Sequence, residues 1–79
     1  MNKPMNLQDA MLNSLRKTKQ DTVVFLISGF QIRGKIRGYD NFVVIMETAD
    51  GKQQMVYKHA ISTVVPSQAV DLREEDEEQ

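Results

Sequence analysis

The sequence contains no cysteine, no tryptophan and a single histidine, and these absences exclude several kinds of site. Without cysteine, the chain can form neither a disulfide nor a thiolate zinc site. One histidine does not supply a typical zinc ligand set, and no cofactor is expected. Chains of roughly 70–80 residues tend to need a disulfide, a structural metal or oligomerisation, although some fold alone. For these 79 residues, composition therefore predicts one small domain that self-associates.

Long hydrophobic runs are also missing. Residues 1–6 hold no apolar stretch long enough for a signal peptide. The longest apolar run, from Val23 to Ile27, is far shorter than the roughly 18 residues of a membrane-spanning helix. Together with the lack of cysteine, these absences predict a cytoplasmic protein with no membrane partner.

Charge is distributed unevenly, although the formal net charge is only −1. Residues 71–79 contain six acids and one base, whereas residues 1–70 contain five acids and nine bases. This division predicts a basic, anion-binding domain over residues 1–66 and an acidic, disordered tail over residues 67–79. A tail that only improves solubility is an equally open interpretation.

One helix is predicted near the start of the chain. Asn6 and Asp9 have the spacing of a helix N-cap and an acidic residue three positions later. Apolar residues then recur every four positions from Leu7 to Leu15, which indicates one apolar stripe. The helix is expected over residues 7–18.

Five short strands are predicted after this helix, which makes the fold mainly β with one N-terminal α-helix. Arg33, Lys35 and Arg37 alternate with apolar residues and glycines, so they form a positive stripe on one face of the second strand. A solvated strand face is the simpler interpretation of this stripe. The glycines indicate sharp bending or close backbone approach, and short bent strands are typical of a small, partly open barrel. The strands are expected at residues 22–27, 31–38, 42–47, 53–57 and 60–65, with turns at residues 40–41 and 49–52 and a tight connection at residues 58–59.

Unpaired strand edges must be covered, and pairing with further copies in a closed ring would cover them. Two segments resemble the motifs of a family that forms such rings. Residues 29–42, GFQIRGKIRGYDNF, resemble the first Sm motif, and residues 57–63, YKHAIST, resemble the second in its bacterial form. With NLQD at residues 6–9, the chain over about residues 6–66 resembles the Hfq family of bacterial Sm-like RNA chaperones. The resemblance implies six copies in a ring, each with a strongly bent, five-stranded antiparallel sheet.

The resemblance implies a pore on the helix-bearing, proximal face that binds uridine-rich single-stranded RNA. Its implied residues are Gln8, Asn41, Phe42, Lys58 and His59. Phe42 offers a ring for base stacking, while Lys58 can contact a uracil carbonyl or a phosphate. Taken singly, a phenylalanine after a turn is more often a core residue, and a histidine in a turn is more often a solvated one. Position 41 is asparagine where many relatives carry glutamine.

The opposite, distal face is implied to bind purine-rich strands. Its implied residues are Phe25, Gly29, Phe30, Gln31, Ile32, Gln54 and Thr63. Phe30 and Gln31 replace the isoleucine and lysine of the enterobacterial pattern and resemble relatives from low-GC Gram-positive bacteria. This favours a two-nucleotide repeat with a purine in an aromatic pocket. A core position is the alternative for Phe25.

The outer rim is implied to carry a basic patch that promotes annealing between RNAs. The matching residues are Asn13, Arg16, Lys17 and Lys19. Cations there also suit the negative end of the helix dipole, which is the alternative reason for their presence. Lysine stacks on bases and grips phosphate less well than arginine, so we expect weak annealing by this rim.

The resemblance implies an RNA chaperone that pairs small regulatory RNAs with messenger RNAs without covalent chemistry. A nuclease that uses His59 is the main rival, but acid–base catalysis needs an oriented partner and metal catalysis needs clustered ligands. Neither pattern accompanies His59 in the sequence, so no enzyme activity is predicted. A ring that only scaffolds proteins would not need Gln8, Lys58 and His59. DNA binding is not among the predictions.

Overall fold

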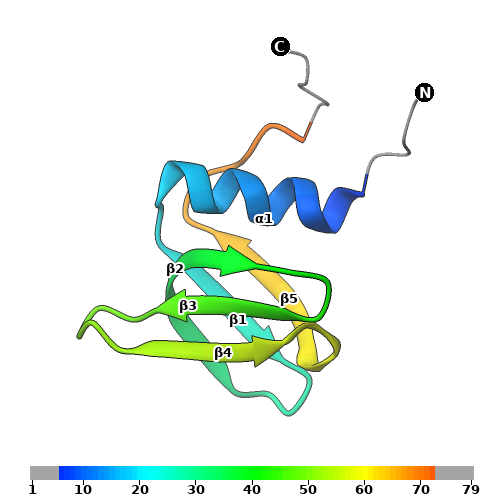
Figure 1. Cartoon of the computed structure of the whole chain (residues 1–79). Coiled ribbons are helices and arrows are strands. Elements are labelled where there is room, and N and C mark those ends of the chain that lie inside the picture. The colour runs from blue at the N-terminus through cyan, green and yellow to red at the C-terminus, as the bar shows by residue number, and fades with distance from the viewer. Residues whose placement is uncertain (1–5, 73–79) are drawn as a thin grey trace.

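The computed structural model describes residues 6–72, which form one helix followed by five strands (Figure 1). The predicted order of elements is confirmed, and most ends agree within one residue. Pro66 is the last residue of the fifth strand rather than the residue after it, as an edge strand tolerates. The elements are α1 (Leu7–Thr18), β1 (Thr22–Leu26), β2 (Gln31–Tyr39), β3 (Val43–Glu47), β4 (Gln53–Tyr57), the 3-10 turn η1 (Lys58–Ala60) and β5 (Ile61–Pro66).

The helix begins and ends where its capping residues predict. The Asn6 side chain accepts a hydrogen bond from the Asp9 backbone N–H at 3.2 Å. At the other end, Lys19 adopts a left-handed conformation with φ 55°, and its N–H donates to the Leu15 carbonyl at 3.0 Å. Leu12 and Leu15 are buried on the face that packs toward the sheet.

The sheet is antiparallel with the order β4-β3-β2-β1-β5, so β2 is its middle strand and β4 and β5 are its edges. The first half of β2 pairs with β1 and the second half with β3. The register shifts between Ile36 and Gly38, and β2 curves so that its last part passes beneath α1 (Figure 1). The predicted strong bending is thereby confirmed.

Gly34 lies against the backbone at the end of β3. A side chain at this position would collide with the backbone carbonyl of Glu47. The predicted close backbone approach is therefore confirmed at Gly34. At Gly38 a side chain would meet nothing, and the register shift there fits the other alternative, sharp bending.

The core lies between α1 and the concave side of the sheet. Although residues 23–27 are all apolar, only Thr22 and Val24 of β1 are buried, and Ile27, just after the strand, is 70% exposed. The helix packs mainly on β2, which leaves the second face of β1 partly open. The buried apolar residues are Leu12, Leu15, Val24, Ile36, Val44, Met46 and Val56.

The chain continues in contact with the domain after β5. The Gln20 side-chain oxygen accepts hydrogen bonds from the Ser67 hydroxyl at 3.0 Å and the Gln68 N–H at 2.7 Å. Val70 packs against the core. The rest of the predicted acidic tail, residues 73–79, lies outside the described residues. No helix within residues 6–72 has the length and apolar character needed to cross a membrane.

Candidate nucleic-acid interface

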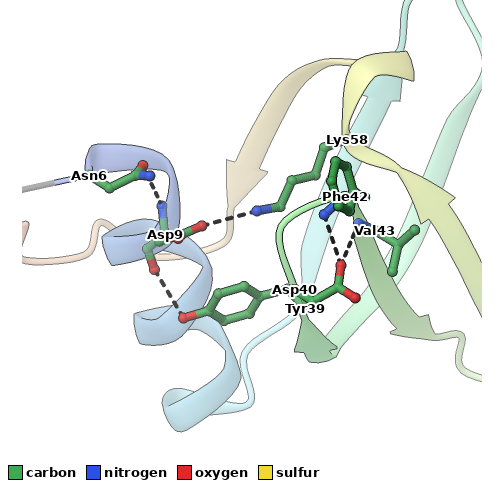
Figure 2. Close-up of polar contacts among 7 residues, drawn as sticks. All are labelled: Asn6, Asp9, Tyr39, Asp40, Phe42, Val43 and Lys58. Atoms are coloured by element: carbon green, nitrogen blue, oxygen red, sulfur yellow. Dashed lines mark hydrogen bonds and ion pairs between the residues drawn. The ribbon is translucent and has the colours of Figure 1, made fainter.

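Phe42 is held at the tip of the β2–β3 connection with its ring in solvent. The Asp40 carboxylate accepts hydrogen bonds from the Phe42 N–H at 2.8 Å and the Val43 N–H at 2.9 Å (Figure 2). The Phe42 carbonyl in turn accepts one from the Lys58 N–H at 2.8 Å. Phe42 is 73% exposed. The interpretation of Phe42 as a core residue is therefore wrong, and the ring is available for stacking.

The same hydrogen bonds affect the Asp40 carboxyl. The Phe42 and Val43 N–H groups donate to its ionised form, and they hold the pKa of Asp40 below its ordinary value of 3.8. The positive charge of Lys58 adds a smaller effect in the same direction. At neutral pH the loop that presents Phe42 is thus fixed by an ionised side chain.

Lys58 reaches from the end of β4 to the first turn of α1. Its ammonium lies 3.0 Å from a carboxylate oxygen of Asp9 and 5.5 Å from the centre of the Tyr39 ring. The Tyr39 hydroxyl donates to the Asp9 backbone carbonyl at 3.4 Å, which closes the cluster (Figure 2). Asp9 was expected only as a capping residue. Its role as the partner of Lys58 has no local signal, since 49 residues separate the two.

The remaining proximal residues surround this cluster. Gln8 follows Leu7 in the first turn of α1, and both line a groove of about 330 Å³ between α1 and β5, together with Lys58. Asn41 and His59 are exposed. The His59 ring stacks on Tyr57 with 5.6 Å between the ring centres. One chain therefore brings Gln8, Phe42 and Lys58 to one end of the molecule, with His59 next to Lys58.

Most of the predicted distal residues lie around the β1–β2 connection. Phe25 pairs with Gln31 on one side and with Thr63 on the other. It is half-buried and is not part of the core among the described residues. Gly29 has φ 97°, a conformation that glycine adopts without strain, and the turn leaves the Phe30 side chain 69% exposed. Ile32 follows Gln31 on β2 and is half-buried.

Gln54 is the exception among the distal residues. It lies on β4, opposite Met46 of β3, and three strands of the sheet separate it from Thr63 on β5. A single chain therefore does not bring Gln54 and Thr63 together along the sheet.

The rim residues lie toward the C-terminal end of α1. Arg16, Lys17 and Lys19 are exposed, and none of the three forms an ion pair within the described part of the chain. The Asn13 side-chain oxygen accepts a hydrogen bond from the Arg16 guanidinium at 2.7 Å. The same described range contains no group of three His, Asp or Glu residues that could hold a metal ion.

Comparison with known proteins identifies close relatives. A family model described as Hfq protein matches residues 7–71. The RNA-binding protein Hfq of Desulforudis audaxviator is 61% identical over 67 residues, which cover 85% of this chain and 80% of the relative. The Bacillus pumilus RNA-binding protein Hfq is 54% identical over 70 residues, covering 89% and 94%. The RNA-binding protein Hfq of Halalkalibacterium halodurans is 53% identical over 77 residues, which cover 98% of this chain and 97% of the relative.

Two solved structures share the fold. A crystal structure described as the pleiotropic translational regulator Hfq superposes with a TM-score of 0.72 at 42% identity, covering 76% of this chain and 98% of that one. An Hfq protein from Anabaena superposes with a TM-score of 0.67 at 24% identity, covering 75% and 93%, which shows likeness of fold alone.

Proposed function

Because this chain belongs to the Hfq family, we propose that it acts in the cytoplasm as a homohexameric ring that binds single-stranded RNA. Uridine-rich strands bind at the proximal pore and purine-rich strands at the distal face. By holding both, the ring promotes pairing of small regulatory RNAs with messenger RNAs. The family is not enzymatic, in agreement with the prediction that the chain catalyses no reaction.

The presentation of Phe42 is the observation that best supports RNA binding. An exposed aromatic ring offers a surface on which a nucleobase can stack without covalent chemistry. The Phe42 N–H donates to Asp40 and its carbonyl accepts from the N–H of Lys58, whose side chain lines the same groove as Gln8. A ring, a cation and an amide together can bind a base and the backbone that carries it.

The separation of two aromatic sites supports two RNA-binding faces. The backbone of Phe42 is tied to Lys58, which contacts the first turn of α1. Phe30 belongs to the β1–β2 connection, which lies at the end of the sheet away from α1 (Figure 1). Two exposed phenylalanines at different ends of a small domain favour two separate RNA-binding sites over a single site.

The edges of the sheet support the ring. β4 and β5 are both unpaired on one side within the described chain, and they expose Met55, Tyr57 and Val65. Exposed apolar edge strands are prone to pair with another chain. Pairing of β4 with β5 of the next copy would also bring the strand of Gln54 next to the strand that carries Thr63.

Reciprocal substitution of the two exposed phenylalanines tests the proposal. Phe42→Ala should weaken binding of a uridine oligomer by about tenfold to a hundredfold and leave a purine-rich oligomer unaffected, because one stacked base contributes about 1–3 kcal/mol. Phe30→Ala should do the reverse. Each variant is the matched control for the other, since both remove an exposed ring. Equal weakening of both oligomers by either variant, with the ring intact, would contradict two separate faces.

Light scattering tests the assembly. Six copies of the 9.0 kDa chain should give a particle of about 54 kDa at micromolar concentration in near-physiological salt. A monomer under these conditions would contradict the ring and the pore with it. A duplex DNA of the same length, used as competitor, measures how far the binding is selective for single-stranded RNA.

A further inference from the structure

The positive stripe of β2 consists of Arg33, Lys35 and Arg37, and the proposed function does not use it. Arg33 is exposed, and the side chains of Lys35 and Arg37 are 43% and 47% exposed. Glu47 stands opposite Lys35 in the β2–β3 register, and its carboxylate lies 3.3 Å from the Arg37 side-chain nitrogen. Despite the bulge beside it, Arg37 therefore reaches the same Glu47 that stands opposite Lys35, and the two cations lie on one side of the strand.

The ion pairs along this stripe leave it able to bind anions. Lys35 lies 2.8 Å from Asp21 and Arg37 pairs with Glu47, whereas Arg33 forms no ion pair with any described residue. Ion pairs between exposed side chains are weak, and a lysine or arginine in such a pair keeps further N–H donors. A phosphate can therefore bind to Arg33 directly and share the other two cations with their carboxylates.

The stripe connects two of the proposed RNA-binding surfaces. It begins beside Phe30 and Gln31, which belong to the distal set. Its middle residue, Lys35, is held to Asp21, which follows the rim residue Lys19 by two positions. β2 continues from there to its end beneath α1 (Figure 1). Arg33 and Arg37 are four residues apart, or roughly 13 Å, so the stripe covers the part of β2 that lies between the distal residues at its start and Asp21 beside the rim.

The surroundings of the stripe leave room for a nucleic acid strand. Arg33 and Lys35 line a cavity of about 590 Å³, whose other walls include Thr48, Gly51 and Ser67. β2 is the middle strand of the sheet, so pairing of copies through β4 and β5 would leave its outward face uncovered. The cations recur at every second residue, about 6.6 Å apart. An extended sugar–phosphate chain can follow this spacing with successive phosphates.

We propose that the stripe binds the phosphate backbone of a single-stranded RNA as it passes from the distal face to the rim. The purines of the strand are held at the distal face, and its flanking nucleotides follow Arg33, Lys35 and Arg37 toward Lys19. The stripe thereby delivers a flanking sequence of any composition to the surface where annealing takes place. This inference rests on the proposed distal face.

Flank-dependent binding tests the inference. The ligands are a short purine-rich oligomer and the same oligomer with a cytidine extension at its 5′ or its 3′ end. In the wild-type protein, one extension should raise the affinity and steepen the salt dependence by about 2 in log K against log salt, since three phosphate contacts contribute about 0.7 each. Arg33→Gln should reduce that slope by about 0.7 and leave the short oligomer unaffected. The triple Gln variant of Arg33, Lys35 and Arg37 should abolish the gain from the extension.

Lys52→Gln is the matched control. It also removes one exposed positive charge from each chain, and Lys52 lies in the β3–β4 turn outside the stripe. Equal losses for Lys52→Gln and Arg33→Gln would mean that general charge attracts the flank, and the stripe would be rejected. The stripe would also be rejected if neither extension raised the affinity, or if the triple variant kept the gain in affinity. Failure of the short oligomer to bind the wild-type protein would instead refute the proposed distal face.

Discussion

The Lys58 ammonium lies 3.0 Å from the Asp9 carboxylate, and this ion pair joins the second Sm motif to the first turn of α1. Only 11% of the Lys58 side chain is exposed, against 37% for Asp9. The pair is therefore intermediate between a solvated surface pair and a buried one. An RNA oxygen atom that binds the Lys58 ammonium must share it with the Asp9 carboxylate or displace that carboxylate.

A double-mutant cycle measures the strength of this pair. Asp9→Asn and Lys58→Gln should each lower the free energy of unfolding, and the double variant should cost less than their sum, with a coupling of about 1 kcal/mol. Thermal unfolding at one fixed protein concentration measures this, because assembly makes stability depend on concentration. The exposed Asp21–Lys35 pair, treated in the same way, should show a smaller coupling that disappears in high salt. Equal coupling energies in both pairs would mean that the lower exposure of Lys58 does not strengthen its ion pair.

Substitution of two glycines on the same strand tests the bend of β2. Gly34→Ala should lower the free energy of unfolding by about 2–4 kcal/mol, since the new methyl group meets the Glu47 carbonyl. Gly38→Ala is the matched control and should change stability little, because nothing lies near its missing side chain. Denaturant unfolding of the two variants compares them directly. A tolerated Gly34→Ala would mean that β2 and β3 separate easily at this point.

The loop of Phe42 should respond to acid through Asp40. The pKa of Asp40 is lowered in the folded protein, so its ionised form stabilises the loop above pH 3.8, and this contribution is lost as the pH falls below 3.8 through the folded-state pKa. The amide NMR signals of Phe42 and Val43 should shift in that range. In Asp40→Asn, whose side-chain oxygen can still accept both hydrogen bonds, they should not.

The β3–β4 turn provides an internal control for this titration. The Thr48 hydroxyl, and to a lesser extent the Lys52 N–H, lower the pKa of Asp50 in a separate loop. The Lys52 amide signal should therefore shift on acidification in both the wild-type protein and Asp40→Asn. Loss of this shift in Asp40→Asn would show that the substitution disturbs more than its own loop.

Removal of residues 73–79 tests the acidic tail. These residues carry five acids and one base, so their loss should modestly tighten nonspecific RNA binding at low salt and speed annealing, most of all through the rim cations Arg16, Lys17 and Lys19. The chain should end at Leu72, because Val70 packs on the core and Leu72 lines the groove beside α1. Titration with a random-sequence oligomer from low to high salt measures the effect. Identical curves would mean that the tail only improves solubility.

The elements that local patterns determine could be predicted from the sequence. The Asn6 cap, the apolar stripe of α1 and the alternation of β2 all depend on residues close together in the sequence. The cap and the alternation are found in the structure, and the stripe is found except for Leu7, which is 62% exposed. Burial of β1 could not be predicted in the same way, because it depends on which face the helix covers. An apolar run carries no information on that choice.

The polar contacts of the site depend on pairs that are distant along the chain. The Lys58–Asp9 pair and the bonds of Gln20 to Ser67 and Gln68 join segments 47–49 residues apart. Neither partner of such a pair has a distinctive neighbourhood in the sequence. The turn that exposes Phe42, by contrast, has a local signal in Asp40, since a carboxylate at this position can accept hydrogen bonds from the N–H groups two and three residues later.

The position of β5 has a kinetic consequence. It pairs with β1, from which about forty residues separate it, so this seam, the β1–β5 pairing, closes a long loop. Contacts between residues so far apart in the sequence slow folding more than local contacts do. In the proposed ring the other side of β5 faces the next copy. Before the seam closes, β1 presents the same unpaired backbone that a neighbour's strand could occupy. At high concentration, refolding should therefore slow as exchanged pairings accumulate, whereas dilution should favour closure within each chain before the ring assembles.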